Sequence, residues 1–333
     1  MSDLDLLVVG AGPTGLAIGA EARQANLQFL IADRGAVTQA LLDFPTNMTF
    51  FTTRDLLEIA GMPFSVPDDK PNRQQALVYY RGVATRYDLP FALHEEMLSA
   101  RADGAGFVVS SRGDDGRERL RRTRAVALAT GYFGQARRLG VPGEDLPWVR
   151  GRYLEPYGHF GEHVVVVGGG NSAAEVALEL WRNGSRVTLV HRGAAVKPTV
   201  KYWVKPDIEN RLAAGQIDSR MESRVVAFAD HQVELETPRG RESLTADCVY
   251  VLIGYTPDAE LLRRFGVHVD PVTLIPDHDP STCESNTPGV YVAGTLQSGR
   301  DTGKIFIENS RDHGGRIVQH LLGRLRRPLE TVR

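Results

Sequence analysis

The sequence predicts an α/β fold built around two parallel β-sheets. Residues 5–35 and residues 162–193 each contain an apolar strand, a glycine-rich turn, a helix rich in alanine and leucine, and a second strand. The strands are apolar without a break, as in Val164–Val167, which is typical of a parallel sheet covered on both faces. A strand, a G-x-G-x-x-G/A turn, a helix and a strand in this order predict a Rossmann-like dinucleotide-binding domain, and the chain contains two such patterns.

Further strands outside these two units extend the predicted sheets. A buried strand ends at a small-residue turn in residues 124–131, and a matching run occupies residues 247–258. Residues 289–294 again form a strand followed by glycine, and we predict a helix over residues 305–322. Because strands flank the second unit on both sides, the sequence predicts that one domain is inserted into the other.

We therefore expect a discontinuous domain and an inserted domain. The discontinuous domain comprises residues 1–133 and 255–333, and the inserted domain comprises residues 134–254. Such insertions are tolerated because the two ends of a domain often lie close together. Residues 140–144, with the sequence GVPGE, look like a linker between the domains, since glycine and proline both interrupt regular structure.

Composition and charge exclude several classes of protein. The 333 residues carry a formal net charge of -2, which gives no reason to expect nucleic acid or an anionic membrane as a partner. The N-terminus has no signal-peptide pattern, and no apolar run is long enough to span a bilayer. The two cysteines, Cys248 and Cys283, exclude a disulfide framework. We expect a cytoplasmic protein without a metal site.

The first glycine turn predicts a site for the diphosphate of FAD or NAD. Its glycines permit a tight turn and a close approach of a diphosphate to the N–H groups at a helix start. Asp33 ends the second strand, where a carboxylate can accept hydrogen bonds from both ribose hydroxyls and would repel a ribose phosphate. The predicted FAD contacts in this region are Gly10, Gly12, Pro13, Thr14, Gly15, Asp33, Arg34, Thr130, Gly131 and Gly294.

The second glycine turn predicts a preference for NADPH over NADH. Its second strand ends in His191 and Arg192, with no acid. Arg192 can hold a 2′-phosphate bidentately, His191 can stack or donate, and Lys197 is a further phosphate partner, although a merely solvated strand end remains open. The predicted contacts at the turn are Gly168, Gly170, Asn171, Ser172 and Ala173. A chain with both sites is expected to move hydride from nicotinamide to flavin.

Several motifs carry a resemblance to known families. The double unit, the turn at residues 129–131 (ATG) and the stretch at residues 254–258 (GYTPD) resemble the low-molecular-weight thioredoxin reductases over nearly the whole chain. Residues 44–64, 200–208 and 305–314 contain segments that those enzymes lack, and these segments are similar to the bacillithiol disulfide reductase family.

This resemblance implies the thioredoxin-reductase architecture, with the NADPH-binding domain inserted into the FAD-binding domain. It also implies reduction of bacillithiol disulfide to two thiols, rotation of the inserted domain to bring nicotinamide and flavin together, and a homodimer. By analogy, Met48, Thr49, Phe51 and Ile305 would line the isoalloxazine. Residues 201–205 combine aromatic rings with lysines, which could receive the carboxylates of a bacillithiol-like molecule or form a seam between domains.

The chain departs from these families in its redox residues. A thioredoxin reductase needs two cysteines beside the flavin that pass electrons as a dithiol, and this chain has no such pair. We expect Cys248 to be an inert core thiol and Cys283 to have no redox role. Members of the bacillithiol family commonly carry cysteine where this chain has Thr14, and a hydroxyl cannot attack a disulfide as a thiolate does. Thr295 stands where flavin reductases usually place an aspartate. The bacillithiol-type proteins also tend to lack this acid.

Two alternatives to disulfide reduction stay open. A ferredoxin- or flavodoxin-NADP reductase of the thioredoxin-reductase type also combines FAD and NADPH without a cysteine pair. A non-enzymatic redox sensor would keep both nucleotide sites. A flavin monooxygenase is disfavoured because residues 149–155 lack the histidine of its signature. No side chain is a compelling acid or base, and His313 is the best candidate for a proton source, against a capping or packing role.

Overall fold

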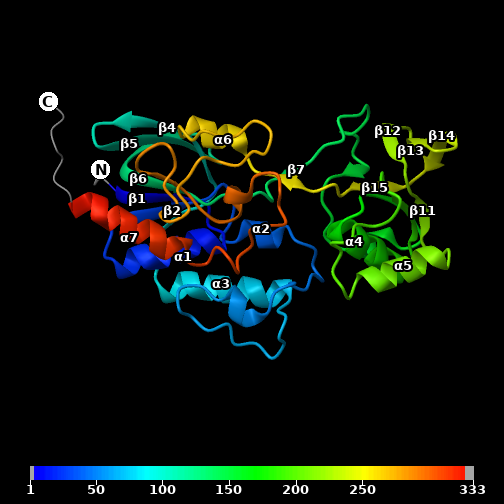
Figure 1. Ribbon diagram of the computed structural model, residues 1–333, viewed down its shortest axis with the longest axis horizontal. Coiled ribbons are helices and arrows are strands. Elements are labelled where there is room, and N and C mark those ends of the chain that lie inside the picture. Colours follow the sequence, from blue (N-terminus) through cyan, green and yellow to red (C-terminus); the bar gives the residue numbers. More distant parts are fainter. Residues whose placement is uncertain (1–3, 327–333) are drawn as a thin grey trace. The chain divides into compact units, whose positions relative to one another are not determined.

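The computed structural model describes residues 4–326, which form two compact units (Figure 1). The first unit contains residues 4–42, 48–135 and 256–326 of the described chain, and the second contains residues 43–47 and 136–255. Two short strands, β7 (Gln135–Ala136) and β16 (Tyr255–Thr256), stand where the chain passes between the units, and they pair with each other. None of the helices in this part of the chain is long and apolar enough to cross a membrane.

The first unit is built on a seven-stranded mixed sheet. The second half of β6 pairs in parallel with β1 on one side and β17 on the other, whereas its first half pairs antiparallel with β5. The parallel strands end at the same edge, so the turns that follow β1, β6 and β17 lie together there. The strands are β1 (Leu4–Val9), β2 (Phe29–Ala32), β3 (Phe91–Ala92), β4 (Glu95–Asp103), β5 (Gly106–Gly113), β6 (Glu118–Leu128) and β17 (Val290–Val292).

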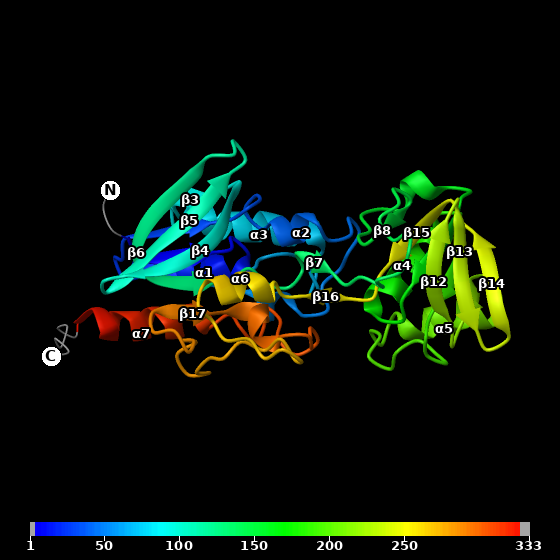
Figure 2. The same cartoon turned by 90° about the horizontal axis from the view of Figure 1, so that it is seen from above.

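Helices cover both faces of this sheet. On one face α1 (Pro13–Gln24) packs against α7 (His313–Arg326) and α3 (Arg73–Arg86), while α6 (Ala259–Arg264) lies over the other face beside β4 (Figures 1 and 2). α1 begins at Pro13, whose fixed φ suits the first helical position. α3 begins with a capping box between Asn72 and Gln75. The short elements of this unit are α2 (Gln39–Leu42), η1 (Arg54–Leu57) and η3 (Gly294–Ser298).

The second unit is a five-stranded parallel sheet with different layers on its two faces. Val164 and Val166 pack with α4 (Asn171–Arg182) and α5 (Lys205–Ala213), whereas Val165 and Val167 face a three-stranded antiparallel sheet. This alternation explains the uninterrupted apolar strand in the sequence. The parallel strands are β8 (Val149–Arg150), β9 (His163–Val167), β10 (Arg186–Val190), β11 (Asp218–Arg220) and β15 (Cys248–Val251), and the antiparallel ones are β12 (Arg224–Ala229), β13 (Gln232–Thr237) and β14 (Gly240–Thr245). A short helix, η2 (Tyr157–His159), precedes β9.

The predicted linker at residues 140–144 is wrong, because this segment is packed within the second unit. The carboxylate of Glu144 accepts the N–H groups of Leu139 at 2.7 Å and Gly140 at 2.8 Å. Gly143 has a φ of +79°, and a Cβ on it would lie 1.9 Å from the carbonyl oxygen of Phe228. These glycines therefore serve a tight loop and close packing rather than a flexible connection.

The helix predicted over residues 305–322 begins later, at His313, and extends to Arg326. In the preceding segment, the side chain of Asn309 accepts the N–H of Phe306 at 2.7 Å and donates to the carbonyl oxygen of Lys304 at 2.8 Å. Such side-chain bonds offer the backbone an alternative to helical hydrogen bonds, which explains the late start.

Residues 43–47 group with the second unit, although the sequence places them within 1–133. Asp43 pairs with Arg152 at 2.7 Å, and Asn47 donates to Glu179 at 2.5 Å. The N–H of Thr46 also donates to the carbonyl oxygen of Leu154. The remaining boundaries fall at 135/136 and 255/256, compared with 133/134 and 254/255 from the sequence.

The crossing of α7 over α1 requires glycine at position 314 but not at 315. A Cβ at Gly314 would lie 2.9 Å from the backbone carbon of Ala17, whereas a Cβ at Gly315 would have no described atom within 4 Å. We expect Gly314→Ala to lower the free energy of unfolding by about 1–3 kcal/mol through overpacking. The matched Gly315→Ala should be neutral or stabilise by up to about 1 kcal/mol. Urea unfolding measures both, and equal effects would contradict this packing.

Candidate nucleotide-binding sites

The first glycine of each predicted turn approaches the backbone of a neighbouring strand. Gly10 has a φ of +112°, and a Cβ there would lie 2.5 Å from the carbonyl oxygen of Ala129, at the end of β6. Gly168 has a φ of +150°, and a Cβ would lie 2.4 Å from the carbonyl oxygen of Leu252, just after β15. A side chain at either position would force the strand ends apart, so glycine is required in both units.

The second glycine of each turn faces open space at a helix start. No described atom lies within 4 Å of a Cβ placed on Gly12 or Gly170, and both residues cap their helices without a side-chain hydrogen bond. The first-turn N–H groups of a helix lack intrahelical partners and carry a partial positive charge. This arrangement fits a diphosphate held against α1 in one unit and against α4 in the other.

The third position of each motif packs the helix onto its own turn. A Cβ on Gly15 would lie 1.8 Å from the carbonyl oxygen of Gly10, so only glycine fits. Ala173 occupies the corresponding place in the second unit, and its methyl group is 2.9 Å from the Cβ position of Gly168. The two turns are therefore alike in geometry, with slightly more room in the second.

Asp33 follows β2 and is tied to the first turn. Its carboxylate accepts the N–H of Ala11 at 2.7 Å and the N–H of Gly35 at 2.8 Å. A carboxylate has about four acceptor sites, so it retains capacity for two ribose hydroxyls. Asp33 is only partly exposed, and its backbone is held between Ala92 and Glu95 by further hydrogen bonds. The turn and the predicted ribose acceptor are thus one connected structure.

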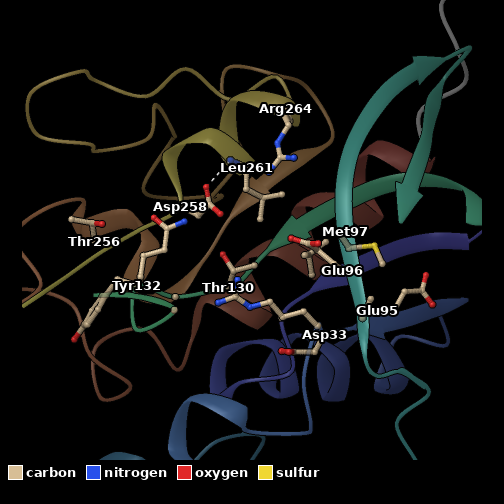
Figure 3. Close-up of a pocket in the computed structure, with 17 residues that line it drawn as sticks. Asp33, Glu95, Glu96, Met97, Thr130, Tyr132, Thr256, Asp258, Leu261 and Arg264 are labelled. Carbon is tan, nitrogen blue, oxygen red and sulfur yellow. Dashed lines mark hydrogen bonds between the residues drawn. The ribbon is translucent and has the colours of Figure 1, made fainter. Parts of the chain in front are cut away.

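A pocket in the first unit brings together some of the predicted FAD contacts. Gly10, Asp33, Arg34, Thr130 and Gly131 all line it. Figure 3 shows Thr130 between the side chains at α6 and Asp33, with the side chains of β4 to one side. The remaining lining residues are Val9, Ala32, Glu95, Glu96, Met97, Tyr132, Gly134, Gln135, Thr256, Asp258, Leu261 and Arg264.

Sequence reasoning missed the lining residues on β4 and α6. Burial acts to raise the pKa of Glu95, but hydrogen bonds from Arg121 and Ser111 outweigh it and lower the pKa, so the carboxylate is ionised and paired. Arg264 comes from α6. Neither Glu95 nor Arg264 belongs to a local motif, whereas Asp258 ends the GYTPD stretch and caps α6 at the N–H of Leu261. Of these three residues, Asp258 alone had a signal in the sequence.

Thr14, Gly294 and His313 form a compact group at the same edge of the sheet. Gly294 has a φ of +69°, and a Cβ on it would lie 2.6 Å from Oγ1 of Thr14. Its N–H donates to Nδ1 of His313 at 3.1 Å, in a buried hydrogen bond. Burial lowers the pKa of His313 to about 4, so its imidazole is neutral near pH 7. This geometry favours the packing role over the proton source.

The residues expected to line the isoalloxazine lie in loops of the first unit outside the pocket. Met48 accepts the N–H of Arg73 with its carbonyl oxygen, and Thr49 forms a bridge with Asn72. Phe51 has 54% of its surface exposed and lies under Lys70. Ile305 precedes α7, and its segment is joined to the first loop by a hydrogen bond from Thr52 to Glu308. Two of the three family-specific segments therefore meet in the structure.

The second unit carries the cations predicted for a 2′-phosphate. Arg192 and Lys197 are exposed just beyond β10, and the N–H of Lys197 donates to the carbonyl oxygen of Gly169 in the turn. His191 is buried, and its ring fills the space that a Cβ on Gly169 would occupy. Burial, with the charges of Lys197 and Arg192, lowers the pKa of His191, which makes the imidazole neutral. The positive charge available to a 2′-phosphate at this strand end is therefore that of Arg192 and Lys197.

The start of α4 is tied to the third family-specific segment. Asn171 accepts the N–H of Lys201 at 2.7 Å, while Ser172 is exposed beside it and Ala173 is buried. Lys201 pairs with Glu175, and Lys205 pairs with Glu209. Both lysines therefore have carboxylate partners within the second unit.

Both cysteines are buried, in different units. Cys248 is 3% exposed and Cys283 is fully buried, and burial raises the pKa of each thiol. A thiol with a raised pKa is mainly protonated near neutrality and is a poor nucleophile. Among the described residues there is also no cluster of three or more His, Cys, Asp or Glu side chains that could hold a metal ion.

Comparison with known proteins agrees with this geometry. A family model described as pyridine nucleotide-disulphide oxidoreductase matches residues 7–294. The chain is 33% identical over 321 residues to bacilliredoxin reductase Bdr of Bacillus subtilis (strain 168), covering 96% of this chain and 97% of that protein. It is 31% identical over 311 residues to a ferredoxin–NADP reductase of Saccharopolyspora erythraea, covering 88% and 85%.

Solved structures show the same relationship. The structure of bacillithiol disulfide reductase Bdr (YpdA) from Bacillus cereus matches with a TM-score of 0.94 and 32% identity, over 97% of this chain and 100% of that one. Thioredoxin reductase from T. acidophilum matches with a TM-score of 0.77 and 20% identity, over 98% and 99%, which shows the fold alone. The predicted thioredoxin-reductase-like α/β fold is confirmed.

The fold and the paired turns define a pyridine nucleotide-disulphide oxidoreductase, and the chain belongs to that family. Within it, the chain belongs to the bacillithiol disulfide reductase (Bdr) family, as the segments at residues 44–64, 200–208 and 305–314 predicted.

The buried imidazole of His313 predicts a loss of stability in acid. Its pKa is about 4 in the folded protein and 6.5 by reference, so the unfolded chain binds the extra proton first. The neutral imidazole therefore stabilises the fold fully above pH 6.5, and about 3 kcal/mol is lost as the pH falls towards 4. Asp312, Arg316 and His278 are the charged or titratable groups that act on it.

His313→Asn tests this expectation, because asparagine keeps an acceptor near the Nδ1 position and does not titrate. Urea unfolding between pH 4 and 7 should show a shallower pH dependence for this variant than for the wild type. Parallel curves for the two proteins would contradict the assignment.

Proposed function

We propose that this protein is a FAD-dependent oxidoreductase that uses NADPH to reduce bacillithiol disulfide to two thiols. Membership of the Bdr family supports the reaction class. The observation that carries the cofactor assignment is the contrast between two similar glycine turns: Asp33 follows one, and Arg192 follows the other. FAD, when bound, supplies the two-electron redox chemistry. NADPH, a proton and one disulfide then give NADP⁺ and two thiols.

The first unit would hold FAD through its backbone and Asp33. The open face at Gly12 and the first-turn N–H groups of α1 would receive the diphosphate. Asp33 would accept the ribose hydroxyls while it keeps the N–H of Ala11, and the pocket between β4 and α6 would take the adenosine end. Met48, Thr49, Phe51 and Ile305 are proposed for the isoalloxazine by family resemblance.

The second unit would hold NADPH through the turn at Gly168–Ala173 and the cations beyond β10. Arg192 and Lys197 are exposed, so a 2′-phosphate can reach both, and their charges favour it. His191 would act as a neutral filler against Gly169. NADH lacks the phosphate that these cations would bind, so NADPH is the proposed donor.

The protein supplies no thiol relay for the outgoing electrons. Cys248 belongs to the second unit and Cys283 to the first, and both are buried. Thr14 places a hydroxyl at the turn, beside Gly294. The acceptor would therefore be reduced directly by the flavin, with the residues of the chain serving to bind and orient both nucleotides.

Direct electron transfer from flavin also suits a second candidate, a ferredoxin- or flavodoxin-NADP reductase. The similarity to the ferredoxin–NADP reductase of S. erythraea and the hydroxyl at Thr14 favour this alternative. A redox sensor is the corresponding non-enzymatic hypothesis. A cytoplasmic location and a homodimer remain predictions.

The acceptor test compares bacillithiol disulfide with oxidised ferredoxin and oxidised flavodoxin. Purified protein reconstituted with FAD should oxidise NADPH with bacillithiol disulfide, and the rate should survive in the Cys248→Ser/Cys283→Ser double variant, because neither thiol takes part. Turnover with ferredoxin or flavodoxin alone would establish the second candidate instead. Activity that disappears in the double variant would contradict reduction directly from the flavin.

The nucleotide preference is tested by Arg192→Ala. Losing a charge-assisted contact to the 2′-phosphate should raise the KM for NADPH about 10- to 100-fold and leave the KM for NADH nearly unchanged. Arg186→Ala is the matched control, because Arg186 is exposed at the opposite end of the same strand, β10. Steady-state kinetics with both nucleotides measures the effect. An equal change for NADPH and NADH would overturn the assignment.

A further inference from the structure

A buried hydrogen bond joins the end of β17 to the start of α7. The N–H of Gly294 donates to Nδ1 of His313 at 3.1 Å, and both residues are buried. The N–H of the preceding Ala293 donates to the carbonyl oxygen of Leu128, so the chain leaves the sheet just before this contact. His313 is therefore the partner of the first backbone N–H beyond the sheet.

On its other side, Gly294 lies against the first glycine turn. Gly294 has a φ of +69°, and its Cα faces the side chain of Thr14, so that a Cβ on Gly294 would lie 2.6 Å from the Thr14 hydroxyl. The next residue, Thr295, is also close to a turn, because its Oγ1 would lie 3.3 Å from a Cβ on Gly131. The backbone at 294–295 thus packs between the ends of β1 and β6.

His313 is fixed from behind by the helix crossing. Gly314 packs on the backbone of Ala17 and Ile18, as its missing Cβ would lie 2.9–3.0 Å from their atoms. The N–H of His313 donates to the carbonyl oxygen of Ser310. Both partners of the hydrogen bond between His313 and Gly294 are buried, so losing the imidazole would leave the N–H of Gly294 without its acceptor in a buried place.

We propose that His313 is a positioning residue for the FAD-binding turn. Its neutral imidazole accepts the N–H of Gly294 and holds residues 294–295 beside Thr14, where the diphosphate-binding N–H groups of α1 begin. Removing the acceptor leaves a buried N–H without a partner, and the loop must move to satisfy it. This role rests on the proposed FAD site.

The protonation state agrees with the geometry. An imidazolium has no free lone pair, so only the neutral form can accept the hydrogen bond. Burial keeps the pKa of His313 at about 4, which maintains the acceptor throughout the neutral range. Among neighbouring charges, Asp312 favours protonation while Arg316 and His278 oppose it.

The test measures FAD affinity of the apoprotein by flavin fluorescence for three variants. His313→Leu removes the acceptor and should weaken FAD binding about tenfold or more. His313→Asn restores an acceptor near Nδ1 and should stay within about threefold of the wild type. His320→Leu is the matched control, because His320 also lies on α7 and bonds through Nδ1 to β17, at the hydroxyl of Tyr291. It should lower the melting temperature without changing FAD affinity.

The outcomes separate this inference from the proposed function. If wild-type apoprotein binds no FAD, both are overturned. If His313→Leu binds FAD as the wild type does, or His313→Asn is as weak as His313→Leu, only the positioning role fails. Should His313→Leu not fold, FAD release on acidification decides the question: the wild type should release FAD as the pH falls towards 4, and His313→Asn should retain it. Identical release curves would reject the role.

Discussion

The close approach of strand ends at Gly10 and Gly168 is the constraint on which both sites depend. At each position a side chain would collide with a carbonyl oxygen of the adjacent strand, at Ala129 or Leu252. This approach lets the chain turn at once from the strand into the helix, with its unpaired N–H groups facing open space at Gly12 and Gly170. The backbone alone therefore offers a place that fits a diphosphate, before any side chain contributes specificity.

Specificity then comes from a few side chains placed after the second strand of each unit. In the first unit, Asp33 both anchors the turn through Ala11 and keeps capacity for hydroxyl donors. In the second, the ring of His191 fills the space over Gly169 and the backbone N–H of Lys197 bonds to Gly169, so the side chains of Arg192 and Lys197 take no part in anchoring the turn. We propose that the same backbone turn serves two ligands of different charge, because anchoring and recognition are combined in Asp33 in the first unit and divided among several residues in the second.

The sequence could predict features that arise from neighbours along the chain. Glycine turns, apolar strands and the charge at Asp33 or Arg192 all act locally, and the α/β fold followed from the turns and strands. The family followed from the resemblance of residues 44–64, 200–208 and 305–314. Composition at residues 140–144 could not reveal that the Glu144 carboxylate holds this loop by accepting backbone N–H groups. Periodicity could not reveal that the side chain of Asn309 bonds to the backbone before α7, so that the helix begins only at His313. Glu95 and Arg264 in the pocket and the acceptor role of His313 are likewise products of tertiary packing, without a local signal.

Thr14 shows how packing and redox chemistry are connected at the turn. Its hydroxyl occupies the space beside Gly294, so this position is a contact of the scaffold as well as a potential site of chemistry. A threonine there preserves the contact and removes any thiolate that the helix start would stabilise. The two cysteines do not compensate, because burial raises their pKa and they belong to different units. In the function that we propose, redox chemistry is left to a bound cofactor, and the protein contributes geometry: backbone N–H groups, Asp33 as a ribose acceptor, and the neutral His313 beside the loop.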